Sequence, residues 1–109
     1  MIRILTFETD PTEAIHLSQL LQAGGFAVAT VTTTQQTISF AREYVFDVFV
    51  FNLRTPRETG FTTVAEIKCL PQTAHVQIIG LVPASNMLTL AEEADCDAVL
   101  IGTAEGGPV

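Results

Sequence analysis

Basic residues are scarce in this chain of 109 residues, which has 5 Lys and Arg against 12 Asp and Glu and a formal net charge of −7. Proteins that bind nucleic acid directly usually carry a basic patch, because the neutralisation of phosphates drives their affinity. Here the few basic residues are also scattered along the chain, at Arg3, Arg42, Arg54, Arg57 and Lys68. We therefore expect no direct binding to nucleic acid.

Long apolar runs are missing as well. No run approaches the roughly 20 residues that a membrane-spanning helix needs. The first residues, MIRIL, lead directly into a strand-like segment and not into the apolar stretch of a signal peptide. The composition, 48% hydrophobic and 16% charged, is typical of one folded domain with its own core. These features predict a cytoplasmic protein that does not bind membranes.

Motifs for covalent or cofactor chemistry are absent from the sequence. Cys69 and Cys96 do not have CxxC spacing, and we interpret them as buried or half-buried reduced thiols, with a disulfide or a metal site as the alternative. Neither Ser39 nor Ser85 has a histidine nearby in the sequence, and the chain contains no glycine-rich dinucleotide motif or P-loop. The sequence predicts neither an enzyme nor a cofactor.

The chain does have a regular alternation of apolar runs and helical patterns. Strands separated by helices indicate a parallel sheet with right-handed crossovers, and hence an α/β domain. The predicted strands are residues 2–7, 26–31, 46–51, 76–82 and 98–101, and the predicted helices are residues 11–23, 34–44, 61–70 and 86–94.

The first two helices have clear signals at their ends. Asp10 is a suitable N-cap, with Pro11 at the first helical position and Glu13 as the returning residue of a capping box. Gly24 and Gly25 end that helix. Thr33 or Thr34 can cap the second helix. The residues expected to face inward are Ala14, Leu17, Leu20 and Leu21 on the first helix and Ile38 and Ala41 on the second.

The carboxyl ends of the strands are where a parallel sheet places its chemistry. Glu8 and Asp10 follow the first strand and Asn52 follows the third, so the three side chains meet if these strands are adjacent. A Mg²⁺ ion prefers several carboxylates, but Asn52 is a neutral amide and Asp10 is engaged as a helix cap. We therefore expect an acidic, solvated rim, with Glu8, Asp10 and Asn52 as weak candidates for metal ligands.

Four segments of the chain together resemble the receiver domain of two-component response regulators, the CheY-like superfamily. The resemblance extends from residue 2 to about residue 103, and its most specific part surrounds Asn52. The segments are ILTFETDP at 4–11, FDVFVFNLRTP at 46–56 with Gly60 and Phe61 after it, VQIIGLV at 76–82 and ADCDAVLI at 94–101.

This resemblance implies a three-layer, flavodoxin-like fold with a parallel five-stranded sheet of strand order 2-1-3-4-5. In the family, an aspartate at the end of the third strand accepts a phosphoryl group from a histidine kinase. Two further acids and that aspartate hold Mg²⁺, and a Thr or Ser and a Lys complete the site.

The chain departs from the family at nearly every one of these reactive positions. Asn52 stands at the acceptor position, Glu8 and Thr9 at the acid pair, Val82 at the Thr or Ser position and Ile101 at the Lys position. An amide is not the anionic nucleophile that an acyl phosphate requires. Val82 has no hydroxyl and Ile101 no charge to offer a phosphoryl group. The resemblance therefore implies a degenerate pseudo-receiver, which signals by binding a protein partner, a signalling kinase or an output domain.

The length of the chain predicts a further departure. We expect a receiver-like domain over residues 1–103 and a flexible tail or the start of a linker over residues 104–109, with the family's fifth helix missing or truncated. A missing helix would expose an apolar strip beside the fifth strand, and such strips mark interfaces. A homodimer through this face is one possibility.

Two other functions are compatible with the sequence. The first is the phospho-receiver domain of an atypical response regulator in a phosphorelay, with Thr9, Thr55 or Thr59 as the acceptor. The second is a small-molecule sensor on a flavodoxin-like scaffold, in which the hydroxyls of Thr6, Thr9 and Thr12 receive an anionic group near a helix N-terminus.

Overall fold

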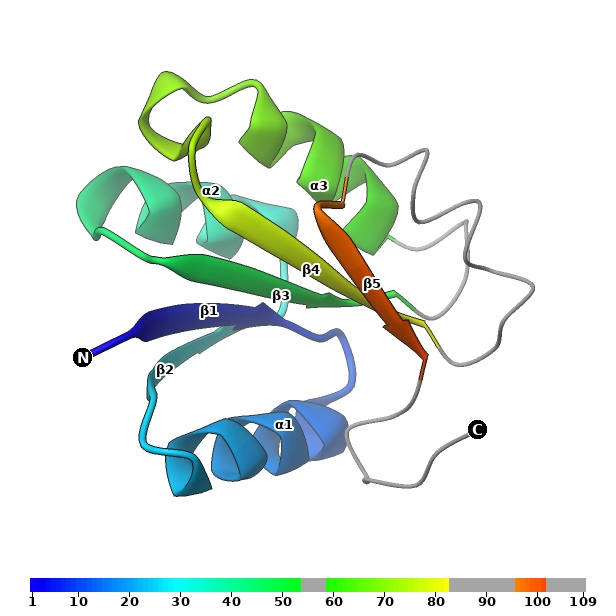
Figure 1. The fold of residues 1–109 in the computed structure, drawn as a ribbon. Coiled ribbons are helices and arrows are strands. Elements are labelled where there is room, and N and C mark those ends of the chain that lie inside the picture. Colours follow the sequence, from blue (N-terminus) through cyan, green and yellow to red (C-terminus); the bar gives the residue numbers. More distant parts are fainter. Residues whose placement is uncertain (54–58, 83–95, 102–109) are drawn as a thin grey trace.

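The computed structural model describes residues 1–53, 59–82 and 96–101. They form a parallel five-stranded sheet with the strand order β2-β1-β3-β4-β5 (Figure 1). Figure 1 shows α1 on one face of the sheet and α2 and α3 on the other. The predicted fold class, layers and strand order are confirmed. The elements are β1 (Arg3–Phe7), α1 (Pro11–Ala23), β2 (Ala27–Val31), α2 (Thr34–Glu43), β3 (Val48–Asn52), α3 (Thr59–Lys68), the 3-10 turn η1 (Pro71–Thr73), β4 (Gln77–Val82) and β5 (Ala98–Ile101).

The boundaries differ from the predicted ones in two places that matter for the site. β3 begins at Val48, two residues later than predicted, and includes Asn52 as its last residue. α3 begins at Thr59 and ends at Lys68, whereas it was predicted over residues 61–70. The predicted fourth helix, the position of a fifth helix and the tail at residues 104–109 lie outside the described residues.

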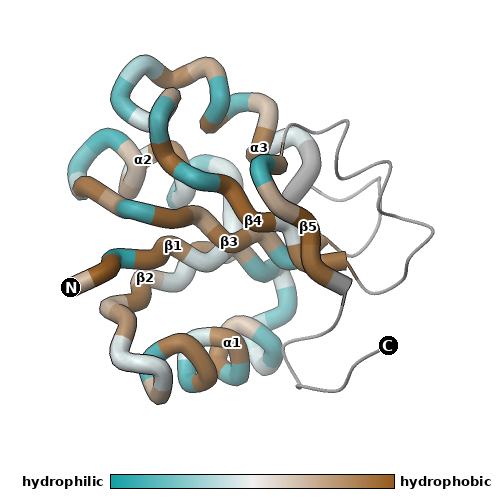
Figure 2. The backbone as a smooth tube through the Cα atoms, viewed as in Figure 1, coloured by the Kyte–Doolittle hydropathy of each residue, from teal (hydrophilic) through white to brown (hydrophobic). Residues whose placement is uncertain are grey.

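The main core lies between the sheet and the helices α2 and α3. Phe49 and Phe51 of β3 are fully buried in it, and the Phe51 ring lies 5.5 Å from that of Phe7. Val50 points to the opposite face and packs with Ile4 and Leu17 in a smaller cluster beneath α1. β3 is therefore covered on both faces, as its apolar run predicted. Figure 2 shows this concentration of apolar residues along the central strands.

The ends of α1 follow the sequence signals with one exception. The Asp10 carboxylate accepts hydrogen bonds from the backbone N–H groups of Thr12 (2.8 Å) and Glu13 (3.3 Å), so Asp10 is the N-cap. Gly24 ends the helix, and Gly25 has φ +90°, a conformation that glycine adopts without a steric penalty. The capping box is wrong, because the Asp10 N–H donates to Glu8 Oε1 and not to Glu13.

Two predictions of burial need correction. Leu20 is 54% exposed, although its spacing predicted an inward side chain, whereas Ala14 and Leu17 are buried as expected. Cys69 is exposed and Cys96 is partly buried, so only Cys96 fits the predicted environment. The second helix agrees with its prediction: Thr33 is the N-cap, Ala41 is buried and Ile38 is partly buried.

Candidate functional site at the carboxyl edge of the sheet

The register of the strands brings the ends of β1, β3 and β4 together. Phe7 of β1 pairs with Phe51 of β3, so the next residues along, Glu8 and Asn52, are neighbours at the carboxyl edge. Asn52 in turn pairs with Leu81 of β4. Successive side chains of a strand point to opposite faces, so Asn52 shares the α1 face with Val50. The adjacency of the first and third strands, on which the predicted meeting of Glu8, Asp10 and Asn52 depends, is confirmed.

Glu8 is fully buried at this edge, which is unusual for a carboxylate. Its Oε1 atom accepts the backbone N–H of Asp10 at 2.8 Å, and its own N–H donates to the carbonyl of Val31 at 3.1 Å. The first contact holds the turn from β1 into α1, and the second ties that turn to the end of β2. Glu8 therefore has a structural role in the loop that leads into the first helix.

Asn52 is 6% exposed, and its side chain points toward the first turn of α1. Its Nδ2 atom donates to Glu13 Oε2 at 3.4 Å. The sequence interpretation missed Glu13 as a member of this site, because it had assigned that carboxylate to the capping box. An acidic residue one turn into a helix that follows β1 is the signal that could have identified it.

The other predicted positions differ in their surroundings. Thr9 is exposed. Val82 is fully buried in the core on the α2 and α3 side of the sheet, the face opposite to Asn52. Ile101 ends β5 and pairs with Val82, while its side chain lies outside the described residues.

The acidic residues at this edge do not form a metal centre within the part of the chain that the structure describes. In those ranges, no group of three or more His, Cys, Asp or Glu side chains is arranged to hold a metal ion. Glu8 Oε1 and Asp10 Oδ1 both accept backbone N–H groups. The side-chain N–H of Asn52 donates to Glu13. The amide is therefore a hydrogen-bond donor at a position where a carboxylate would be a negatively charged metal ligand. At the acceptor position, Asn52 therefore offers a neutral amide beside the carboxylates of Glu8 and Glu13, where Mg²⁺ prefers a further carboxylate.

Of the three hydroxyl groups proposed for a small-molecule site, that of Thr6 is engaged inside the protein. Thr6 is fully buried, and its hydroxyl contacts the Ala29 carbonyl and the Thr30 hydroxyl, each at 3.4 Å. The backbone N–H of Thr12 donates to Asp10, which already satisfies that end of the helix. Among the threonines considered as alternative phosphoryl acceptors, Thr55 and the side chain of Thr59 lie outside the described residues.

Solved structures share this architecture. The chemotaxis response regulator CheY4 of Vibrio cholerae aligns with a TM-score of 0.81 and 20% identity, covering 96% of this chain and 91% of that chain. The response regulator TrrA of Thermotoga maritima, solved with Mg²⁺ and BeF, aligns with a TM-score of 0.78 and 21% identity, covering 94% and 88%. The chain has the CheY-like receiver fold.

One further solved structure and one sequence relative are similar to the chain. The receiver domain of a sensor histidine kinase from Pseudomonas aeruginosa, with magnesium in its active site cleft, aligns with a TM-score of 0.76 and 24% identity over 92% of this chain and 84% of that one. The transcriptional regulatory protein ZraR of Escherichia coli K12 is 32% identical over 78 residues, which are 72% of this chain.

The chain spans only 18% of the length of ZraR, so what ZraR does as a whole does not transfer to it directly. No protein-family profile matches the chain. Within the described ranges, none of the helices is long and apolar enough to span a membrane.

Proposed function

We propose that this receiver-fold domain is a signalling module that cannot be phosphorylated at the usual position and acts through protein–protein interaction. The observation that carries the proposal is Asn52, a neutral amide at the end of β3 that is nearly buried and donates to Glu13. An amide does not supply the anionic oxygen that attacks phosphorus, so the residue at the acceptor position lacks the chemistry for an acyl phosphate.

Three other positions support the same proposal. Thr9 replaces a carboxylate at the rim, Val82 has its side chain in the core, and Ile101 stands where the family has a cation. A doubly charged phosphoryl group at this edge would meet the carboxylates of Glu8 and Glu13 without a cation from these positions to offset its charge.

The partner in this proposal is a protein of a signalling pathway, either a kinase or an output domain, in the cytoplasm. The likeness to part of a transcriptional regulatory protein supports an output domain, which would join the receiver-like domain of residues 1–103 through a linker beginning at residue 104. In this role the domain is a binding module and not an enzyme, and it uses no cofactor.

Self-association is a second element of the proposal. On the α1 face of the sheet, Ile79 and Leu81 are partly buried and Leu100 of β5 is 55% exposed. A homodimer through this strip would cover it. Sedimentation velocity over a range of concentrations is expected to show a dimer that Leu100→Glu dissociates and that Leu20→Glu, a matched change on exposed α1, leaves intact. A monomer at every concentration would contradict the proposed homodimer.

Phosphoryl donors test the main proposal directly. The purified domain is incubated with acetyl phosphate and Mg²⁺ and, separately, with beryllofluoride and Mg²⁺. Intact-mass spectrometry should show no phosphoryl adduct, and the amide NMR spectrum should not change with beryllofluoride. An adduct mapped to Thr9, Thr55 or Thr59 would support the atypical phospho-receiver instead, and substitution of those threonines would then abolish the labelling.

A further inference from the structure

β2 is the edge strand of the sheet and pairs only with β1 among the described strands. The N–H of Ala27 donates to Ile2, and the carbonyl of Val31 accepts from Glu8, so the odd-numbered residues of β2 direct their backbone groups toward β1. Backbone groups alternate in direction along a strand. The N–H and C=O groups of Val28 and Thr30 therefore point outward, where they can pair with an added strand.

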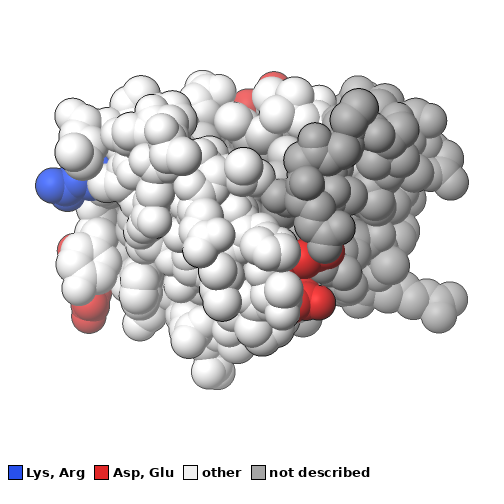
Figure 3. All heavy atoms as spheres, turned by 90° about the horizontal axis from the view of Figure 1, so that it is seen from below, with Lys and Arg blue, Asp and Glu red and all other residues white. Residues whose placement is uncertain are grey.

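This edge lacks the features by which proteins normally protect an exposed strand. Residues 14–41, which include most of α1, all of β2 and most of α2, contain no Asp, Glu, Lys or Arg. Proteins usually place a charge, often Lys, or a proline on an exposed edge, because an unprotected edge pairs with other chains. Figure 3, which looks at the molecule from the α1 side, shows uncharged residues across the middle of the described surface and charged residues toward its ends.

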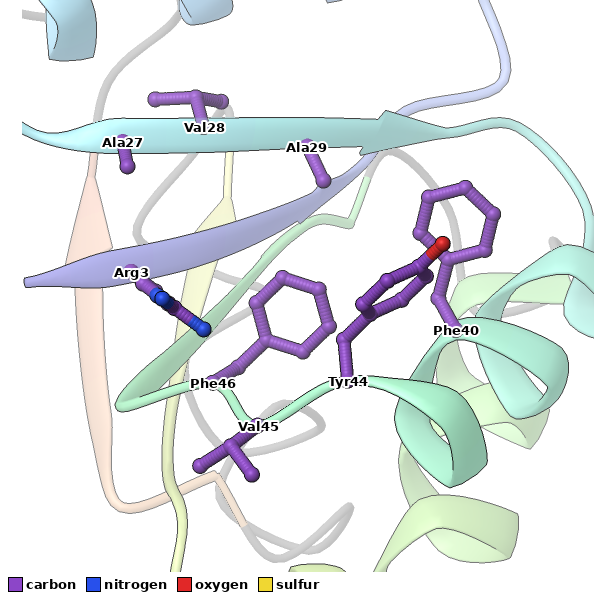
Figure 4. Close-up of a pocket in the computed structure, with 8 residues that line it drawn as sticks. All are labelled: Arg3, Ala27, Val28, Ala29, Phe40, Tyr44, Val45 and Phe46. Atoms are coloured by element: carbon purple, nitrogen blue, oxygen red, sulfur yellow. The ribbon is translucent and has the colours of Figure 1, made fainter.

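A hollow of about 250 Å³ lies beside β2 on the α2 side (Figure 4). Ala27 and Ala29 form one wall, and the aromatic rings of Phe40, Tyr44 and Phe46 form the other. The space exists because alanine is small, whereas strands usually carry β-branched or aromatic residues at such positions. The Phe40 and Tyr44 rings contact each other edge to face at 5.6 Å, which gives the aromatic wall a defined shape.

A second hollow, of about 300 Å³, lies on the other face of the same edge. Thr30 of β2 lines it, together with Ile15 and Ser18 of α1, and Ile15 is 58% exposed. A strand added beside Val28 and Thr30 would direct alternate side chains toward these two hollows. Backbone pairing combined with pockets for alternate side chains is the arrangement by which proteins bind extended peptides.

Arg3 indicates the charge of the occupant. It is exposed at the start of β1 and lines the α2-side hollow, and Figure 4 shows its side chain extending beside Phe46. The nearby Asp47 carboxylate accepts the backbone N–H of Arg3 at 2.8 Å. Among the residues that line this hollow, Arg3 is the charged one, and its guanidinium complements a carboxylate on the bound segment.

We propose that the outer edge of β2 binds an extended segment of a partner protein. The segment pairs with the backbone of Val28 and Thr30, places an apolar side chain in the hollow formed by Ala27, Ala29 and Tyr44, and presents a carboxylate to Arg3. This inference deepens the proposed function, because it assigns the surface and the kind of partner. It does not depend on the absence of phosphorylation.

A designed peptide probe tests the site. The probe is an acetylated and amidated peptide of seven residues, with alternating threonine and valine, leucine at its centre and glutamate near its C-terminus. Added to the ¹⁵N-labelled domain, it is expected to shift the amide signals of Val28 and Thr30 above all others. A control peptide of the same sequence, N-methylated at the amides on its pairing side, should not bind, because it cannot form the ladder.

Substitutions in the domain test the individual contacts. Ala29→Val fills the hollow and should weaken binding by about tenfold or more, while Ala65→Val on the exposed face of α3 should have no effect. Arg3→Gln should weaken binding by about threefold and remove its dependence on salt. Tyr44→Ala, at a side chain 55% exposed, is the second variant if Ala29→Val does not fold.

Each outcome separates this inference from the main proposal. Two results would overturn the proposed peptide site. In the first, peptides with leucine, phenylalanine or tyrosine at the centre all leave the amide signals of Val28 and Thr30 unchanged. In the second, Ala29→Val and Tyr44→Ala do not change the affinity for the peptide. Concentration-dependent dimerisation that Ala29→Val abolishes would overturn it in favour of a second copy on this edge. Phosphorylation by acetyl phosphate would overturn the main proposal and leave peptide binding at β2 standing.

Discussion

The Nδ2 atom of Asn52 donates to Glu13 Oε2 at 3.4 Å, and this contact joins the end of β3 to the first turn of α1. Glu8, fully buried, is the neighbour of Asn52 across the β1–β3 pair. A neutral donor at position 52 is therefore compatible with two carboxylates close by. An aspartate at the same position would bring a third negative charge to the same edge.

Asn52→Asp should lower the stability of the domain and create a dependence on Mg²⁺. The variant loses the contact to Glu13 and gains like-charge repulsion, at a cost of about 1–3 kcal/mol in the free energy of unfolding at neutral pH. Mg²⁺ at millimolar concentration should recover part of this loss, because a cation that binds only the native state stabilises it.

Thermal unfolding with and without Mg²⁺ measures both effects. Asn52→Ala is the matched control, because it removes the hydrogen bond without adding a charge, and it should show no response to Mg²⁺. An Asn52→Asp variant as stable as the wild-type chain, with no response to Mg²⁺, would show that the carboxylates of this edge do not act together.

The role of Asp10 as the N-cap of α1 predicts which of two substitutions costs more stability. Asp10→Ala should cost about 1 kcal/mol in urea unfolding, since the N–H groups of Thr12 and Glu13 lose their acceptor. Asp10→Asn should retain nearly all of the stability, because asparagine caps a helix about as well as aspartate. Equal losses in the two variants would indicate that the charge, and not the cap, is what matters.

Gly80 of β4 leaves room for two side chains, that of Leu53 just after β3 and that of Cys96 just before β5. A Cβ atom at this position would lie 3.0 Å from Cys96 Sγ and 3.2 Å from Leu53 Cδ1. Gly80→Ala should therefore destabilise the domain by about 1–3 kcal/mol, as overpacked cores do.

Combining Gly80→Ala with Cys96→Ala should recover part of that loss, because the nearest atom is removed while the contact with Leu53 remains. A double-mutant cycle followed by urea unfolding measures the coupling. If the losses of stability from the two single substitutions simply add in the double variant, the sheet moves to accommodate the methyl group.

Asp97 joins the beginning of β5 to β4 and α3. Its Oδ2 atom accepts the backbone N–H of Ile78 at 2.7 Å and lies 3.3 Å from Lys68 Nζ. Asp97→Ala leaves the Ile78 N–H without this acceptor and should cost about 1–2 kcal/mol. Lys68→Ala removes only a partly exposed ion pair and should cost no more than about 0.5 kcal/mol. Chemical denaturation of both variants checks the order, which the reverse ranking would contradict.

The sequence by itself determined the fold, the caps of the first two helices and the adjacency of Glu8 and Asn52. Strand and helix periodicities are local, and a parallel sheet aligns the ends of its strands, so these features follow from the chain alone. The helical spacing of apolar residues predicted a wider buried face for α1 than the structure has. Leu20 lies about 90° around the helix from the centre of the stripe formed by Ala14, Leu17 and Leu21, and it stays exposed because the helix covers only a narrow part of the sheet.

Only the tertiary structure decided the partners of the polar side chains and the shape of the edges. Glu13 fits a capping box in the sequence, yet its carboxylate accepts from Asn52, while Glu8 accepts the N–H of Asp10. The hollow beside β2 arises because Ala27 and Ala29 lie opposite aromatic side chains from residues 40–46. These contacts join residues far apart in the chain, and their geometry depends on how helices pack on a twisted sheet, which a one-dimensional pattern does not record.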